Sequence, residues 1–140
     1  MVAVRRGSLS PVSQVTPYLA VPDARSALAW YDDVFGATVT HEPIVMPDGR
    51  VGHCEFEIDG ARFMMADAHP ELQCPAPTPG LGSPVTLHLT VSDVAGLVER
   101  ARAAGARVDR GPEENPVGRV AVLRDPSGHR WFLNEHIDVG

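Results

Sequence analysis

The sequence lacks lysine entirely, because all 12 of its basic residues are arginine. A side-chain Schiff base with a carbonyl substrate requires a lysine amine, so no side chain of this sequence can perform that class of covalent catalysis. Acidic residues outnumber the arginines, which leaves a formal net charge of −6. Proteins that bind nucleic acids usually carry a basic face, and this balance therefore argues against a nucleic-acid partner.

Cysteine is scarce and long apolar runs are missing. The two cysteines, Cys54 and Cys74, are too few for a disulfide framework in a chain of 140 residues, which favours a reducing cytoplasm. No stretch approaches the ~18 apolar residues of a membrane-spanning helix, so we expect no membrane partner. Residues 1–13 lack the apolar segment of a signal peptide, and we predict a disordered tail there.

A repeat organises the rest of the chain. The segment Val85–Asp93 alternates apolar and polar residues like a half-buried strand, and it ends in a helix N-cap signal. The segment Val15–Asp23 has the same pattern in register, and Gly60–Met64 is likewise matched by Gly128–Phe132. The sequence therefore predicts two copies of one unit.

Each copy reads as strand, helix and three strands. In the first unit, 14–68, we predict strands at 14–21, 37–46, 50–58 and 61–68, with a helix between Asp23 and Gly36. In the second unit, 84–137, we predict strands at 85–91, 106–110, 118–123 and 129–136, a helix between Asp93 and Gly105, and a turn-rich connection at 111–116. The proline- and glycine-rich segment 69–83 is predicted to be an irregular linker. The expected fold is a single compact α+β domain of two tandem βαβββ units.

Two motifs in this frame resemble a known family. The helix ending Ala29–Gly36 and the turn Asp125–Trp131 are similar to those of the vicinal oxygen chelate superfamily, also called the glyoxalase/bleomycin-resistance/dioxygenase superfamily. The ending Gly128–Trp131 resembles the branch associated with phosphonate-metabolism operons. The resemblance implies that each unit curls a mixed sheet into a half-barrel with its helix on the convex side. It further implies a ligand cavity between units and a homodimer.

The resemblance also implies where a metal would bind. Metal-dependent members hold one divalent ion with a side chain from the first and last strand of each unit. We locate these positions by counting along each strand from the helix caps Asp23 and Asp93 and from the turn glycines Gly60 and Gly128. They fall on Thr16, Met64, Thr86 and Phe132. None of the four is a good ligand for nickel, zinc, iron or manganese, so we expect no metal cofactor.

Other polar residues share the strand faces of those positions. We predict a cavity lined by Tyr18, His53, Glu55, His88 and Asn134. An alternative is a displaced metal site made by His53, Glu55 and His88. The plainer interpretations are a structural histidine at position 88 and a solvated strand face at Glu55. Arg62 and Arg130 occupy equivalent places in the two units, which suggests a shared structural role or a clamp for an anion.

Two functions follow from these residues. The first is a cytoplasmic protein that binds a small apolar or aromatic molecule through Thr16, Tyr18, His53, Met64, Thr86, Phe132 and Asn134. The second is an enzyme of the lyase, isomerase or dioxygenase type. Such an enzyme would use a divalent metal at the displaced site, or no metal with His88 or Glu55 as the general base.

Overall fold

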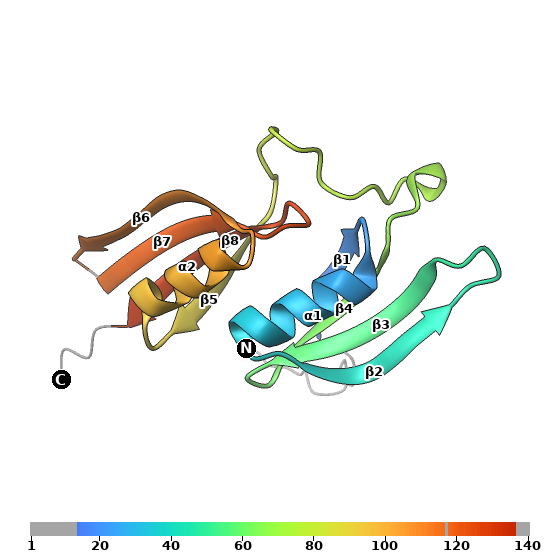
Figure 1. The fold of residues 1–140 in the computed structure, drawn as a ribbon, viewed down its shortest axis with the longest axis horizontal. Helices are drawn as coiled ribbons and strands as arrows, with labels where there is room; N and C mark the ends of the chain where they lie inside the picture. The colour runs from blue at the N-terminus through green and yellow to red at the C-terminus, as the bar shows by residue number, and fades with distance from the viewer. Residues whose placement is uncertain (1–13, 117, 137–140) are drawn as a thin grey trace, which may run out of the picture.

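The computed structural model describes residues 14–116 and 118–136, so the predicted tail at 1–13 lies outside the described residues. The first unit contains β1 (Tyr18–Val21), α1 (Ala24–Phe35), β2 (Thr38–Val45), β3 (Val51–Ile58) and β4 (Ala61–Asp67). A short 3-10 helix, η2 (Pro70–Leu72), follows. The second unit contains β5 (Thr86–Val91), α2 (Val94–Ala103), β6 (Arg107–Asn115), β7 (Gly118–Arg124) and β8 (Arg130–His136). Figure 1 shows the two units side by side.

Each unit forms one four-stranded mixed sheet with one helix. The strand orders are β1-β4-β3-β2 and β5-β8-β7-β6, and neither sheet closes on itself. The first strand of each unit runs parallel to the last, whereas the other neighbours are antiparallel. This arrangement confirms the predicted α+β fold of two tandem βαβββ units.

The predicted capping residues start both helices. The Asp23 side chain accepts a hydrogen bond from the Ser26 amide at 3.2 Å, and the Asp93 side chain accepts one from Gly96 at 3.0 Å. These carboxylates satisfy amides that have no partner within the helix. Gly36 ends α1 at a φ of 71°, in the left-handed region that glycine adopts readily.

One apolar core joins the two units. Strand β3 turns Cys54, Phe56 and Ile58 toward α1, and all three are buried, as the alternation predicts. Trp131 of β8 lies against the ring of Tyr31 from α1, with ring centroids 5.8 Å apart. Phe63, Met65 and Trp131 are buried as expected. Trp30, which lies off the main helical stripe, donates from Nε1 to the Ala104 carbonyl of the second unit at 2.9 Å. The helices and the inner sheet faces thus stabilise each other across the repeat.

Several local predictions were wrong. Segment 111–116 is not a separate connection, because β6 continues to Asn115 and register shifts along the strand accommodate its glycine and proline. Linker 69–83 contains η2 and a bridge between His69 and Cys74. β1 begins only at Tyr18, after Pro17.

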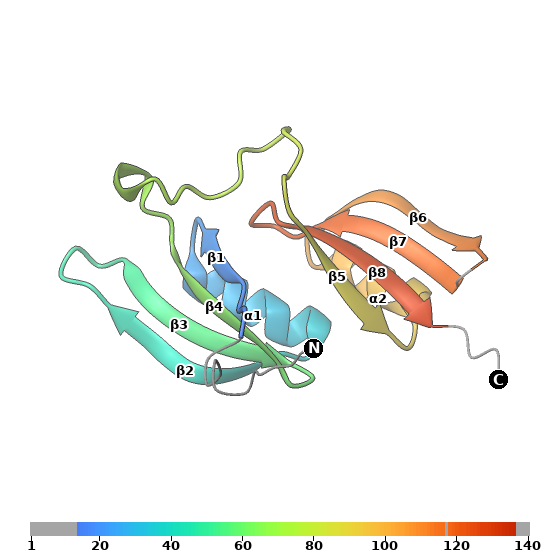
Figure 2. The ribbon, with the colours of Figure 1, turned by 180° about the vertical axis from the view of Figure 1, so that it is seen from behind.

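The two sheets expose their other faces on one side of the molecule. In Figure 2 both helices lie behind the sheets, so the helix-free faces are turned the same way rather than onto each other.

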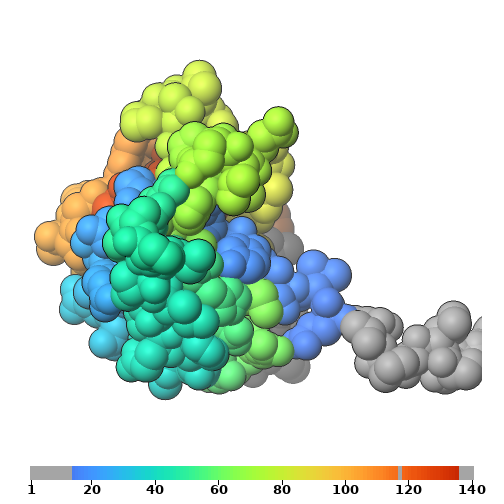
Figure 3. Space-filling model, turned by 90° about the vertical axis from the view of Figure 1, so that its right-hand side faces the viewer, coloured from blue at the N-terminus to red at the C-terminus, as the bar shows by residue number. Residues whose placement is uncertain are grey.

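Figure 3 shows the turn between β2 and β3 lying against the segment that follows β4. Among the described residues, no helix has the length and apolarity needed to span a membrane.

Candidate functional site

The helix-free face of the first sheet carries a connected set of polar side chains. Because side chains alternate along β3, His53 and Glu55 project away from the buried Cys54 and Phe56. Tyr18 of β1 reaches the same face across β4, where Met64 is its register partner. Three strands therefore bring four of the predicted site residues together.

These side chains form a continuous hydrogen-bonded relay. The Tyr18 hydroxyl lies 2.8 Å from His53 Nδ1, and His53 Nε2 lies 2.8 Å from Glu55 Oε2. The other oxygen of Glu55 accepts a hydrogen bond from Arg62 at 3.0 Å. A further histidine, His41 of β2, places its ring 5.8 Å from that of His53. We call Tyr18, His53, Glu55 and Arg62 the relay.

The charges of the relay fix the direction of its hydrogen bonds. The hydrogen bond from His53, followed by that from Arg62, lowers the pKa of Glu55, so this carboxylate is ionised. Partial burial is the main cause that raises the pKa of Tyr18, which keeps the phenol neutral. Since an ionised carboxylate only accepts, His53 Nε2 carries the proton toward Glu55, and Nδ1 accepts from Tyr18; these assignments follow from the partners.

The helix-free face of the second sheet is more apolar. His88 pairs in register with Phe132, and their rings stack with centroids 5.6 Å apart. Val120 and Val122 of β7 are buried although they lie on this face rather than in the core shared with the helices. In the described part of the chain no carboxylate contacts the His88 ring, so nothing there orients it as a base.

Two polar groups border this apolar face. Arg130 hydrogen-bonds to Thr86 Oγ1 at 2.6 Å, and this bond joins β8 to β5. The Nδ2 atom of Asn134 is buried and has no hydrogen-bond partner among the described residues. A buried amide without a partner is costly, which marks Asn134 as a donor that an acceptor on a bound molecule can satisfy.

The structure thus divides the predicted site residues into two groups. Tyr18, His53, Glu55 and Met64 lie on the first sheet, whereas Thr86, His88, Phe132 and Asn134 lie on the second. Among the described residues, no hydrogen bond, ion pair or ring contact joins the two groups. Thr16 is half-buried and precedes β1. The sequence repeat pointed to Arg62, but His41 was missed because register shifts in β2 hide which residues face the site.

Two cavities lie between the units, away from the predicted site residues on the helix-free faces. One, of about 380 Å³, is lined by residues such as Phe35, Leu89 and Arg100. The other, of about 280 Å³, lies beside Trp30 and Asp125. Neither is lined by a predicted site residue, so the helix-free faces remain the candidate site.

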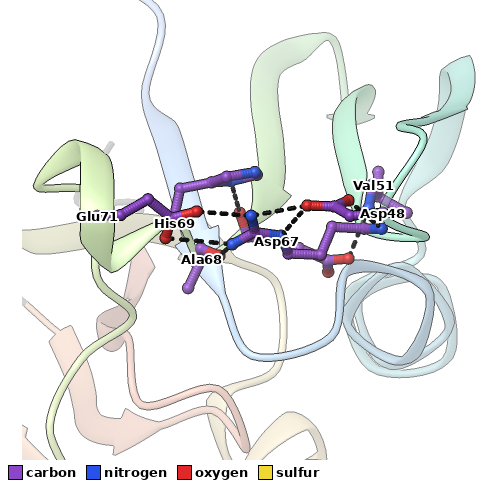
Figure 4. Close-up of polar contacts among 7 residues, drawn as sticks. Asp48, Val51, Asp67, Ala68, His69 and Glu71 are labelled. Atoms are coloured by element: carbon purple, nitrogen blue, oxygen red, sulfur yellow. Dashed lines mark hydrogen bonds and ion pairs between the residues drawn. The ribbon is translucent and has the colours of Figure 1, made fainter.

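A second polar cluster, drawn in Figure 4, joins the β2–β3 turn to the end of β4 and to the segment that follows it. Asp67, at the end of β4, accepts from the amides of Val51 and Ala24, each at 2.6 Å. Arg50 lies between Asp48 and Glu71, with its closest contact to Glu71 at 2.6 Å. This cluster ties the β2–β3 turn and the linker to the adjoining ends of β3 and β4, the two central strands of the first sheet. It therefore fixes the start of β3, two residues before His53.

The donor set does not fit the metal that the family resemblance implies. Of the four implied positions, Thr16 and Thr86 offer neutral hydroxyls, Met64 a thioether and Phe132 no donor atom. Among residues 14–116 and 118–136, no three His, Cys, Asp or Glu side chains gather to hold an ion. Within one chain His53 and Glu55 lie on the first sheet and His88 lies on the second, so the described residues do not bring these three side chains together.

The amino-acid sequence is itself similar to those of known proteins. The profile described as Glyoxalase/Bleomycin resistance protein/Dioxygenase superfamily matches residues 12–133. "Uncharacterized protein Mb0911c" of Mycobacterium bovis is 38% identical over 127 residues, which is 88% of this chain and 83% of that protein.

Two further relatives have more descriptive names. "Anthracycline biosynthesis protein DauV" of Streptomyces sp. (strain C5) is 29% identical over 119 residues, which is 79% of this chain and 42% of that protein. The crystal structure of TnmS3, an antibiotic binding protein from Streptomyces sp. CB03234, superposes with a TM-score of 0.64 at 25% identity. The match covers 91% of this chain and 99% of TnmS3.

Proposed function

Because the chain belongs to the glyoxalase/bleomycin resistance protein/dioxygenase superfamily, we propose that it binds a small apolar or aromatic molecule without a metal. The binding surface is the pair of helix-free sheet faces. The phosphonate-operon branch and a cytoplasmic location stay predictions; the exposed free thiol of Cys74 agrees with the latter.

The chemistry at the four implied metal positions carries this proposal. An enzyme of the metal-dependent type needs several anionic or imidazole donors there, and this chain has two hydroxyls, a thioether and a phenyl ring. Apolar surface with a few hydrogen-bonding groups is instead typical of pockets for organic ligands. The scaffold is thus retained while the donors of the ion are lost.

The second sheet supplies the aromatic part of the proposed pocket. The stacked pair of His88 and Phe132 presents flat rings, and the buried amide of Asn134 lacks an acceptor. A planar ligand with a carbonyl oxygen suits this combination. The antibiotic-binding relative TnmS3 and the anthracycline-pathway relative DauV support a polycyclic aromatic ligand class.

We further propose that a homodimer completes the pocket. Within one chain the helix-free faces are turned to the same side (Figure 2), so neither covers the other. A second copy related by a two-fold axis can place its second sheet over the first sheet of this chain. Exposed apolar side chains in the edge strands β1 and β2 and just before β5 support such pairing, with Tyr18 54%, Ile44 47% and Val85 65% exposed.

A fluorescence titration with an anthracycline tests the proposal. The full chain is expected to bind the drug, and Phe132→Ala is expected to weaken binding about tenfold because a stacking surface is lost, equal to about 1.4 kcal/mol. Leu81→Ala, an exposed linker variant, serves as the matched control. Equal affinity of Phe132→Ala and the unmodified chain contradicts the proposed pocket. Light scattering on the same samples measures whether the binding species is a dimer.

A metal-free enzyme is the second candidate function, and the relay is the observation that favours it. The predicted bases, however, are not well placed. Both oxygens of Glu55 are engaged and its pKa is lowered, while His88 lacks an orienting carboxylate among the described residues. His53 has such a partner and is the better base. Turnover of a bound ligand by the chain, lost in His53→Gln, would establish this function.

A further inference from the structure

We propose that the relay accepts a proton from the ligand, and that the preferred ligands are aromatic molecules with an acidic hydroxyl, such as acidic phenols and hydroxyquinones. This inference rests on the proposed function and names the chemical class that the site selects. The bound form is the oxyanion, held by the Tyr18 hydroxyl.

The relay is not required by the fold, as the repeat shows. Glu55 pairs with Met64 in the first sheet as Val122 pairs with Phe132 in the second, and Cys54 corresponds likewise to Ala121. The counterparts of His53 and Glu55 are therefore Val120 and Val122, both buried valines. Since the same architecture accommodates valines at these positions, the imidazole and the carboxylate of the first sheet have another purpose.

The geometry leaves Tyr18 as the group that meets the ligand. Both ring nitrogens of His53 are engaged, one by Glu55 and one by the Tyr18 hydroxyl. Tyr18 is 54% exposed, and its oxygen retains acceptor capacity on the helix-free face. A ligand hydroxyl can therefore donate to the Tyr18 oxygen while Tyr18 donates to His53.

The proton transfer balances along this path. The ligand hydroxyl proton moves to the Tyr18 oxygen, and the former Tyr18 proton moves to His53 Nδ1. No other bond forms or breaks. The product is a ligand oxyanion hydrogen-bonded to neutral Tyr18, beside a His53 imidazolium that donates from Nε2 to Glu55. The carboxylate stabilises the new positive charge, as an acid–histidine pair does in general-base catalysis.

The charges around His53 favour this product. Titratable and charged groups face it from each strand of the sheet: Tyr18 on β1, His41 on β2, Glu55 on β3 and Arg62 on β4. Glu55 is the anion among them and lies in direct contact with the ring. Arg62 contacts Glu55 rather than His53, so it keeps the carboxylate ionised.

The test uses 4-nitrophenol, which turns yellow when it ionises, and its methyl ether 4-nitroanisole, which has no proton to give. We expect the full chain to bind both, and to raise the ratio of phenolate to phenol for bound 4-nitrophenol about tenfold, which is about one pKa unit. Tyr18→Phe removes only the hydroxyl, and His53→Gln removes the base but keeps a polar side chain. Each should abolish the change in ionisation while 4-nitroanisole still binds. His69→Gln, outside the relay, is the matched control and should titrate like the unmodified chain.

Each outcome decides something different. Binding of both compounds with no change in the ionisation of 4-nitrophenol overturns the relay and leaves the proposed pocket standing. An ionisation change that persists in both Tyr18→Phe and His53→Gln overturns the relay as well. Failure of both compounds to bind overturns the pocket, and the relay with it.

Discussion

The buried carboxylate of Asp125 joins the two units, and its replacement by asparagine should destabilise the whole fold. Asp125 is only 4% exposed, yet its side chain accepts four hydrogen bonds. Oδ2 receives the Tyr31 hydroxyl and the Trp131 indole, whereas Oδ1 receives the backbone amides of Ser127 and His129. Burial raises the pKa of Tyr31 well above its usual value, so the phenol remains a donor.

The expected loss in the free energy of unfolding follows from the hydrogen-bond acceptor that Asp125→Asn removes. If the amide oxygen faces the backbone, the amide nitrogen faces Tyr31, which can reverse its hydroxyl, and Trp131, which cannot accept. One buried indole donor is then left without a partner, at a cost of about 1–3 kcal/mol. The remaining bonds also lose their charged acceptor, so we expect a total loss of about 2–4 kcal/mol in the free energy of unfolding.

Denaturant unfolding at a fixed protein concentration, followed by tryptophan fluorescence, measures this loss. The control is Tyr31→Phe, which should cost about 1.5–3 kcal/mol alone. In the Asp125→Asn background the same change should cost much less, because its acceptor has already changed. A loss for Asp125→Asn within about 0.5 kcal/mol of zero would refute this account of the junction between units.

Three further perturbations have definite expected outcomes. Gly118→Ala should lower the unfolding free energy by at least about 1 kcal/mol, because φ is 139° and the new Cβ would meet a β8 carbonyl at 2.2 Å; unchanged denaturant stability would contradict this. The hydrogen bond from Arg50 lowers the pKa of Glu71 to about 2. The contact therefore stabilises the linker fully at pH values above ~4.3, the ordinary pKa of a glutamate, and this stabilisation is lost as pH falls toward about 2. The protection factor of the Cys74 amide against hydrogen exchange should fall over that range, and Arg50→Gln should lower it at neutral pH; equal protection in both forms would exclude the contact as the anchor. A thiol reagent should label exposed Cys74 quickly and Cys54 only on unfolding, since burial raises the pKa of Cys54 to about 11, and rapid double labelling would contradict that burial.

The repeat and the strand alternation predicted most of the fold. Asp23 and Asp93 marked both helix starts, and the apolar positions of β3 identified its buried face, because capping and period-two alternation are local properties. Segment 111–116 was misread because glycine and proline usually mark turns, whereas here register shifts keep them within a strand. Such a shift depends on the neighbouring strand, which local sequence does not reveal.

The site was predicted only in part for a similar reason. Strand parity placed Tyr18, His53 and Glu55 on one face, and the structure brings them into hydrogen-bonding contact. The predicted grouping of these residues with His88 depends on how the two sheets are oriented relative to each other. Neither the alternation along a strand nor a short sequence motif determines that orientation. Within one chain the sheets lie side by side, so that grouping requires the proposed second copy.

The metal content of the purified, tag-free protein tests the central claim most directly. The account predicts far less than one nickel, zinc, iron or manganese ion per chain by elemental mass spectrometry, with anthracycline binding unchanged after chelation. One such ion per chain, together with loss of binding on chelation, would contradict it.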